Sequence, residues 1–176
     1  MKKLAYMTAV LMLAACSQPG TMGAAAPTGP VALARLQPTQ GNSASGSVTF
    51  RQQGSQVMVT ADISGLKPNA EHGFHVHDKG DCSASDGMST GGHYNPTAQP
   101  HGPQAAGHHA GDMPSLKADA DGKVRSSFAL TGVSIGPAGT DLVGHGLIVH
   151  AQPDDYMTQP TGNAGARIAC GVITLQ

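Results

Sequence analysis

The feature that most constrains the fold of this chain is a series of short runs of β-branched or alternating apolar residues, each bounded by turn-forming residues such as glycine, proline, asparagine or aspartate. Such runs are typical of β-strands, and no stretch keeps a 3.6-residue period long enough for a core helix. About eight strands are expected, among them residues 31–37, 46–51, 56–63, 71–77, 124–130, 146–150 and 167–173. The sequence therefore predicts an all-β domain, built as an antiparallel sandwich or barrel.

The composition agrees with one domain of this class. The chain has 176 residues, 39% of them hydrophobic, and its 24 glycines and 12 prolines follow no collagen-like Gly-x-y period. Ten basic and eleven acidic side chains nearly balance. This balance excludes a strongly basic nucleic-acid binder and an acidic disordered chain, so we expect no nucleic-acid partner.

The N-terminal residues are typical of an export signal. A basic Met-Lys-Lys start precedes an apolar run over residues 4–15, which is shorter than the roughly 20 residues of a membrane-spanning helix and fits a secretory signal. The run ends in Leu-Ala-Ala-Cys16, which resembles the bacterial lipobox, where cleavage precedes a cysteine whose sulfur carries diacylglycerol. The alternative is an ordinary signal peptide followed by a cysteine by chance.

The organisation of the chain follows from this signal. We expect a lipoprotein signal peptide over residues 1–15, a lipidated Cys16 with a flexible tether over 16–30, and one folded domain over 31–176. The protein would then be exported to the periplasm or cell envelope. It would meet a membrane only through its lipid anchor, at the outer membrane if the source is Gram-negative.

Cysteine usage fits an oxidising compartment. If Cys16 carries lipid, Cys82 and Cys170 remain as an even pair, and a disulfide between them would close a long loop. The alternative is two free buried thiols.

Two connections are long for a small β domain. Residues 78–114 and 151–166 both exceed the typical length of about 4–6 residues. The first is rich in histidine, glycine and aspartate, and the second leads to Arg167. Because long loops in compact domains commonly carry binding or catalytic residues, we interpret both as functional.

Four histidines have the spacing of metal ligands. His75 and His77 occupy positions i and i+2 of an expected strand, so their imidazoles project from one face. His150 ends another expected strand, and His93 opens a turn. Four imidazoles suit a tetragonal Cu(II) site.

A second set has the ligand types that zinc prefers. His93, His101 and His109 follow one another at intervals of eight residues, and Asp112 comes three residues later. Three imidazoles and one carboxylate make a closed tetrahedral set. Spacing alone leaves open whether His93 serves one set or both.

Four motifs of the domain occur in the order known from one family. They are Gly73-Phe-His-Val-His77, Gly92-His-Tyr-Asn-Pro96, His109-Ala-Gly-Asp112 and Gly162-Asn-Ala-Gly-Ala-Arg-Ile-Ala-Cys-Gly171. Together they resemble copper/zinc superoxide dismutase over about residues 31–176. The resemblance implies an eight-stranded Greek-key β-barrel or sandwich of immunoglobulin-like architecture, with two long functional loops.

The resemblance also implies the metal ligands. One copper ion per subunit would be held by His75, His77, His93 and His150. One zinc ion per subunit would be held by His93, His101, His109 and Asp112, so that His93 bridges the two ions. Cys82 and Cys170 would form the disulfide.

Two other residues take roles from the resemblance. Arg167 would place its guanidinium at the mouth of the copper channel and contact only the incoming anion. Asp154 would accept hydrogen bonds from a copper-bound and a zinc-bound imidazole and so orient both. The remaining histidines, His72, His108 and His145, are expected to be structural or surface residues, since the His-x-Gly-Asp pattern favours His109 over His108 as a ligand.

The implied function is enzymatic. Two superoxide radicals and two protons would give O2 and H2O2 through Cu(II)/Cu(I) cycling, with His93 delivering a proton and Arg167 attracting the anion. One alternative is a non-enzymatic periplasmic copper/zinc buffer or chaperone on the same fold, which has no need of Arg167. Another is an adhesion module in which the histidines are incidental.

The segment 151–166 departs from the animal members of the family. It lacks their long charged loop and is similar to the bacterial branch. We therefore expect a monomer or a bacterial-type homodimer, and the charges that guide the substrate stay open.

Overall fold

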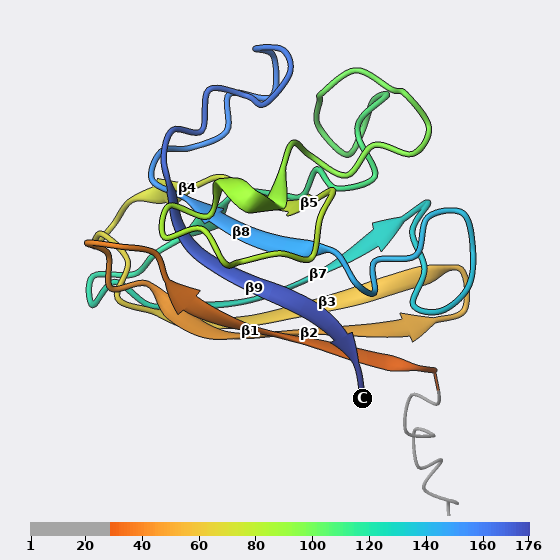
Figure 1. Cartoon of the computed structure of the whole chain (residues 1–176), viewed down its shortest axis with the longest axis horizontal. Helices are drawn as coiled ribbons and strands as arrows, with labels where there is room; N and C mark the ends of the chain where they lie inside the picture. Colours follow the sequence, from red (N-terminus) through yellow and green to blue (C-terminus); the bar gives the residue numbers. More distant parts are fainter. Residues whose placement is uncertain (1–28) are drawn as a thin grey trace, which may run out of the picture.

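The computed structural model describes residues 29–176 (Figure 1). The predicted signal peptide over 1–15, the lipidation site Cys16 and nearly all of the tether lie outside the described residues. Within 29–176 the one helical element is a 3-10 turn, η1 (Met88–Thr90). No helix in this part of the chain is long and apolar enough to cross a membrane.

Seven strands form one curled antiparallel sheet in the order β5-β8-β9-β1-β2-β3-β7, and two short strands, β4 and β6, pair separately. The all-β prediction is therefore confirmed. The strands are β1 (Val31–Pro38), β2 (Ser45–Gln53), β3 (Gln56–Ser64), β4 (Glu71–His72), β5 (Phe74–His77), β6 (Leu116–Lys117), β7 (Val124–Thr131), β8 (Gly146–His150) and β9 (Arg167–Leu175).

The strands differ from the sequence prediction in three details. The run expected over 71–77 is divided at Gly73, whose N–H bonds to the Gln152 carbonyl and where a side chain would bring its Cβ to 2.7 Å from Cβ of Ala164. The two-residue strand β6 is too short to leave a period in the sequence. A third long connection, residues 132–145, joins β7 to β8.

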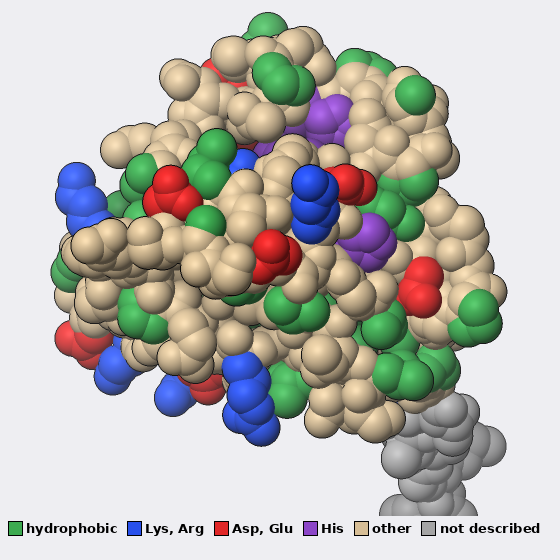
Figure 2. Space-filling view, viewed as in Figure 1, with side chains coloured by type: hydrophobic (Ala, Val, Ile, Leu, Met, Phe, Trp, Pro, Cys, Tyr) green, Lys and Arg blue, Asp and Glu red, His purple; other side chains and the backbone are tan. Residues whose placement is uncertain are grey.

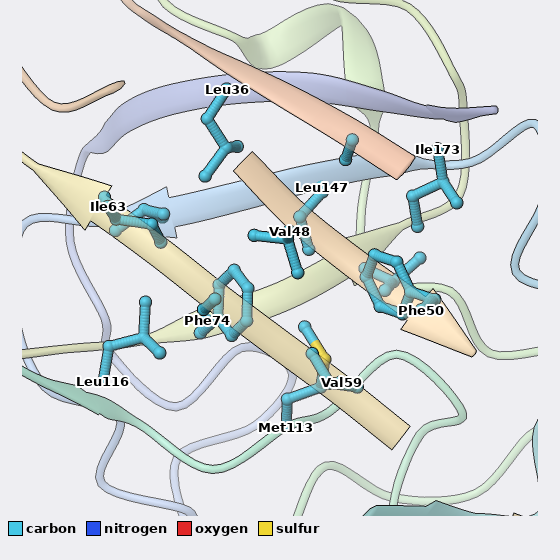
Figure 3. Close-up of a cluster of buried hydrophobic side chains, with 14 of the residues drawn as sticks. Leu36, Val48, Phe50, Val59, Ile63, Phe74, Met113, Leu116, Leu147 and Ile173 are labelled. Carbon is cyan, nitrogen blue, oxygen red and sulfur yellow. The ribbon is translucent and has the colours of Figure 1, made fainter. Parts of the chain in front are cut away.

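The core lies inside the curled sheet (Figure 3). Along β3, buried and exposed residues alternate, as a strand with one face on the core requires. The largest side chains that fill the interior are Leu36, Phe50, Ile63, Phe74, Met113, Leu116, Leu130, Leu142, Leu147 and Ile173.

Strand β5 is buried on both faces, and this positions the functional site. Phe74 and Val76 point into the core, whereas the alternating His75 and His77 point outward and are covered by loops. The neighbouring strand β8 is buried along its whole length in the same way and ends at His150. One face of these two strands therefore belongs to the core and the other to a histidine cluster.

A disulfide ties the first long loop to the sheet. Cys82 in this loop is bonded to Cys170 in β9, with an S–S distance of 2.01 Å and a sequence separation of 88. Closing a loop of this length contributes about 4–5 kcal/mol in chain-entropy estimates. The expected pairing is thus present.

Candidate metal centre

The first histidine cluster lies on the outer face of β5 and β8. His75 and His77 come from β5, His150 from the end of β8, and His93 from the long loop, which forms an isolated β-bridge to His77. All four residues are buried, and one ring nitrogen of each lies within 4.8 Å of the others. In Figure 2, histidine side chains are visible between the two groups of loops at the top of the molecule.

The outer ring nitrogens of this cluster are fixed by hydrogen bonds. Nδ1 of His77 donates to the Gly91 carbonyl at 2.9 Å, and Nδ1 of His150 donates to the Gly165 carbonyl at 3.1 Å. Because each carbonyl can only accept, the opposite Nε2 atoms carry lone pairs, and these two atoms lie 3.4 Å apart. The rings are held with their lone pairs facing one another.

Burial keeps these imidazoles neutral. Desolvation lowers the pKa of His75 from 6.5 to about 4, although a hydrogen bond to Asp154 acts in the opposite direction. Desolvation, together with the neighbouring His75 and His93, lowers the pKa of His150 to about 3. Only a neutral imidazole can ligate a metal, so these rings are ready to bind at neutral pH.

The second cluster has the separations of a tetrahedral metal site. Oδ1 of Asp112 lies 2.8 Å from Nδ1 of His93, 3.0 Å from Nδ1 of His101 and 3.3 Å from Nδ1 of His109. The Nδ1 atoms of His93 and His109 are 3.4 Å apart. Around a tetrahedral zinc ion, with bonds of about 2.0–2.1 Å, neighbouring ligand atoms are about 3.3–3.4 Å apart. The donor set therefore fits zinc.

Asp112 is held as an ionised carboxylate. Burial opposes its ionisation, but hydrogen bonds from His93 and from the Gly102 backbone N–H outweigh burial and lower its pKa well below 3.8. Its Oδ2 accepts from the backbone N–H groups of Gly102 at 3.1 Å and His109 at 2.9 Å. The carboxylate keeps Oδ1 directed at the three imidazoles.

Several buried nitrogens have no hydrogen-bond partner among residues 29–176. Three of them, Nδ1 of His75, Nε2 of His93 and Nδ1 of His101, belong to the two clusters. Leaving a buried polar atom without a partner costs about 1–3 kcal/mol, whereas a bound metal ion would satisfy each lone pair. Since Nδ1 of His93 lies in the second cluster, its Nε2 is the atom that faces the first one. One imidazole thus offers a nitrogen to each cluster.

Comparisons with known proteins agree with this geometry. The family model described as "Copper/zinc superoxide dismutase (SODC)" matches residues 44–173. The chain is 40% identical over 133 residues to "Superoxide dismutase [Cu-Zn] 1" of Aquifex aeolicus (strain VF5), a match that covers 73% of this chain and 79% of the relative. This chain belongs to the copper/zinc superoxide dismutase family. The expected cofactors, copper and zinc, are confirmed at the level of that family.

Solved structures support the same assignment. A SOD-like protein from Bacillus subtilis is 35% identical, with a TM-score of 0.73, over 80% of this chain and 96% of that chain. A double mutant of the same protein is 36% identical, with a TM-score of 0.74, over 81% of this chain and 96% of that chain. The expected barrel of the superoxide dismutase family is thus confirmed as the fold of this chain.

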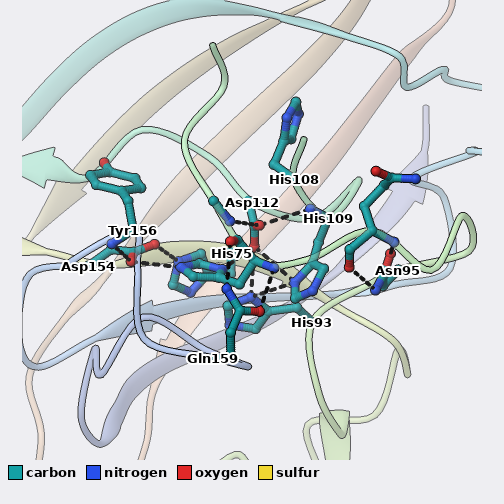
Figure 4. Close-up of polar contacts among 12 residues, drawn as sticks. His75, His93, Asn95, His108, His109, Asp112, Asp154, Tyr156 and Gln159 are labelled. Atoms are coloured by element: carbon teal, nitrogen blue, oxygen red, sulfur yellow. Dashed lines mark hydrogen bonds and ion pairs between the residues drawn. The ribbon is translucent and has the colours of Figure 1, made fainter. Parts of the chain in front are cut away.

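In this superoxide dismutase family member, Asp154 connects the two clusters as the resemblance implied (Figure 4). Oδ2 accepts from Nε2 of His75 at 2.7 Å, and Oδ1 accepts from Nε2 of His101 at 2.9 Å. Burial opposes ionisation of Asp154, but the hydrogen bonds from His75, from the Tyr156 backbone N–H and from His101 outweigh it and lower its pKa. The carboxylate fixes one ring in each cluster.

Arg167 lies beside the first cluster, called the copper-type cluster from here on (His75, His77, His93 and His150). The expectation that it contacts only the incoming anion is wrong. Its Nη1 donates to the Gly87 carbonyl and to Oγ1 of Thr90, both at 2.8 Å, and its Nη2 donates to the Gly91 carbonyl at 2.7 Å. Three of the five guanidinium N–H bonds are therefore used by the loop, and the other two donate to none of residues 29–176. The signal that sequence reasoning missed is the pair of glycines, Gly87 and Gly91, that flank η1 and carry two of the acceptors; the third acceptor, Thr90, is the last residue of η1.

The other histidines stay outside both clusters, as expected. Nδ1 of the buried His72 donates to the His150 carbonyl at 2.8 Å and so supports that ligand's backbone. His145 bonds to the Asp78 carbonyl and stacks on Tyr94 at 3.8 Å between ring centres. His108 is half-buried and bonds only locally, to the Ala106 carbonyl, in the described part of the chain.

Proposed function

We propose that this chain is a superoxide dismutase of the cell envelope, which converts two superoxide radicals and two protons into O2 and H2O2. Copper would be held by His75, His77, His93 and His150, and zinc by His93, His101, His109 and Asp112. When bound, copper supplies one-electron redox chemistry by alternating between Cu(II) and Cu(I), and zinc orients the shared imidazole.

The observation that carries this proposal is that the imidazole of His93 directs one ring nitrogen at each cluster. Its two ring nitrogens face different clusters, and its ring lies 4.0 Å from that of His75 and 5.5 Å from that of His109, between ring centres. A metal buffer could hold its two ions on separate ligand sets and has no need of a shared imidazole. An imidazole shared between a redox-active and a redox-inert ion is the arrangement that a proton-coupled electron transfer needs.

His93 and Arg167 have separate tasks in the proposed reaction. The Nδ1 atom of His93 is kept in the zinc set by Asp112. Its Nε2 atom, on the copper side, would carry a proton toward the reduced product whenever it is not bound to copper. Arg167 and His77 both donate to the Gly91 carbonyl, at 2.7 and 2.9 Å, so the charge of Arg167 lies beside a residue of the proposed copper site. It would attract the anionic substrate to the same place.

The proposal is tested on the purified protein loaded with copper and zinc. Decay of a pulse of superoxide, followed by ultraviolet absorbance, is compared with decay in the presence of the metal-free protein, and H2O2 is measured at the end. We expect rapid catalytic decay with one H2O2 formed for every two superoxide radicals. Stoichiometric metal binding without accelerated decay would favour the buffer or chaperone instead.

The location in the envelope is part of this proposal. It is supported by the signal-like residues 1–15, by Cys16 in a lipobox-like context, and by the Cys82–Cys170 disulfide, which is typical of oxidising compartments. Lipid on Cys16 would hold the catalytic domain near a membrane, through a tether that ends near residue 30.

A further inference from the structure

The second cluster, called the zinc-type cluster from here on, consists of His93, His101, His109 and Asp112. His101 differs from the other three residues in how its backbone is held. His93 and Asp112 form isolated β-bridges with His77 and His75 of β5, and the Asp112 N–H bonds to the His109 carbonyl at 3.1 Å. These three ligands are therefore fixed by β5 and by one another. His101 lies in an irregular part of the loop with no strand beside it in the described part of the chain.

The backbone of His101 is instead bound by a side chain from the second long loop. Oε1 of Gln159 accepts from the His101 N–H at 2.9 Å, and Nε2 of Gln159 donates to the His101 carbonyl at 2.9 Å. Within residues 29–176, Gln159 is the only hydrogen-bond partner of this backbone N–H and C=O. The primary amide thus pairs with the His101 backbone as a neighbouring strand would (Figure 4).

The same loop also fixes the ring of His101. Asp154 accepts from Nε2 of His101, so ring and backbone are held by two residues five positions apart in one loop. This loop is braced internally: Oδ1 of Asp155 accepts from the Met157 and Thr158 N–H groups at 2.9 and 2.8 Å, and the Gly162 N–H bonds to the Thr158 carbonyl at 2.7 Å. Gln159 therefore projects from an ordered turn.

We propose that Gln159 is a positioning residue for zinc: it holds His101 so that Nδ1 faces Asp112, and it couples zinc binding to the order of residues 154–162. The proposal rests on the zinc assignment made under Proposed function. Without Gln159, the ring would still bond to Asp154, but the backbone that carries it would be free to move. Coupling is reciprocal, so zinc, by fixing His101, must also stabilise the loop that binds it.

The decisive experiment compares Gln159→Leu with Gln152→Leu. Gln152 is an exposed glutamine of the same loop, and its side chain makes no hydrogen bond to any of residues 29–176. Zinc affinity is measured by competition with a chromogenic chelator, and the visible bands of cobalt(II) bound in place of zinc report the ligand geometry. We expect Gln159→Leu to weaken zinc about tenfold and to change the cobalt(II) bands, because partners of ligands typically contribute about 10–100-fold to affinity. Gln152→Leu should match wild type.

A merely structural role would lower the melting temperature and leave the cobalt(II) bands unchanged, and that result overturns the proposal. A zinc affinity of Gln159→Leu within about twofold of wild type also overturns it. If the wild-type protein itself fails to bind one zinc ion, the zinc assignment falls together with the proposal. Superoxide is absent from these measurements, so they are independent of the enzymatic activity.

Wild-type protein gives a second test that needs no variant. Amide hydrogen exchange over residues 154–162 is followed by mass spectrometry with and without zinc. We expect zinc to slow exchange across this segment by about tenfold, and unchanged exchange contradicts the coupling. Amide exchange in β3 serves as the internal reference. This strand pairs with β2 and β7, and in the sheet it is separated from β5 and β8 by β9, β1 and β2.

Discussion

Arg167 and His77 donate hydrogen bonds to the same atom, the carbonyl oxygen of Gly91. The distances are 2.7 Å from Nη2 of Arg167 and 2.9 Å from Nδ1 of His77. One peptide group therefore sets the position of the guanidinium relative to a copper-type ligand. Gly91 has φ of 75° and ψ of −152°, a backbone conformation open to glycine, and in it the carbonyl points toward both donors.

This relationship leads to a graded prediction for Arg167. Arg167→Ala should keep near-normal copper and zinc content, because no ligand is removed, and lower the rate of superoxide removal by about tenfold or more. Arg167→Lys should lose less, since the charge survives without the planar fork, and Arg167→Glu should lose most. Pulse radiolysis of the fully metallated variants gives these rates.

Ionic strength separates steering from structure in the same series. Exposed charges are screened within about 8–10 Å at 0.10–0.15 M salt, so the differences between the variants should shrink as salt rises. Rates equal to wild type in all three variants would mean that Arg167 serves only to hold the loop at Gly87, Thr90 and Gly91.

His93→Ala should disturb both metal sites at once. The substitution removes the one imidazole that offers a nitrogen to each cluster. We expect substoichiometric zinc and an altered visible copper spectrum after loading with both ions. His108→Ala, at a half-buried histidine of the same loop that belongs to neither cluster, is the matched control. Unchanged stoichiometry and spectrum in His93→Ala would contradict the bridging assignment.

Gly162→Ala should weaken both metals by displacing Asp154. A Cβ at this position would overlap Oδ1 of Asp154 and press on Nε2 of His101, and the φ of 66° already disfavours a side chain. We expect affinities about 10–100-fold weaker by chelator competition. Gly132→Ala carries a similar backbone cost, with φ of 74°, but its Cβ would meet nothing within 4 Å. Equal metal affinities in the two variants would reject the steric explanation.

The stability of the metal-free protein should fall as the pH is lowered from 6.5 toward 4. The folded-state pKa values of His75 and His150 lie below the ordinary 6.5, at about 4 and about 3. In this window the unfolded chain takes up protons that the folded chain cannot bind, which favours unfolding. The lowered pKa of Asp112 reduces the stability of the folded state mainly once the pH falls below about 3.8, the ordinary pKa of an aspartate, and so outside this window. Urea midpoints in the presence of a chelator at about pH 7, 6, 5 and 4 give the dependence, and a flat midpoint would disprove it.

The mature chain should begin at a lipidated Cys16. Mass spectrometry of the N-terminal peptide from the membrane fraction should show diacylglycerol and an additional N-acyl chain, because a single acyl chain gives only marginal anchoring. Cys16→Ala should release the protein from membranes. A variant that still sediments with them would refute the anchor.

The strands and the two histidine clusters could be predicted from the sequence because both depend largely on short, local patterns. Alternation along residues 56–63 and the apolar run over 146–150 predicted β3 and β8, and the i, i+2 spacing predicted that His75 and His77 share a face. That His93 belongs to both clusters was predicted only from the order of the four motifs and the family that they resemble, because no local pattern indicates it.

The contacts of the long loops could not be predicted in the same way. Gln159 meets His101 across 58 residues, and Arg167 meets Gly87 across 80. Such pairs depend on where two irregular segments lie after the barrel has formed, and neither segment has a period. The same holds for the break at Gly73, which depends on how closely Ala164 approaches.

The two buried faces of β5 have a consequence for how the strand finds its register. A slip of one residue against β8 would exchange Phe74 and Val76 with the imidazoles of His75 and His77. The aromatic ring would then stand among the would-be ligands, and the imidazoles would face hydrocarbon. Such a chain would lack the proposed copper site, so bound copper would stabilise only molecules in which β5 and β8 are correctly paired.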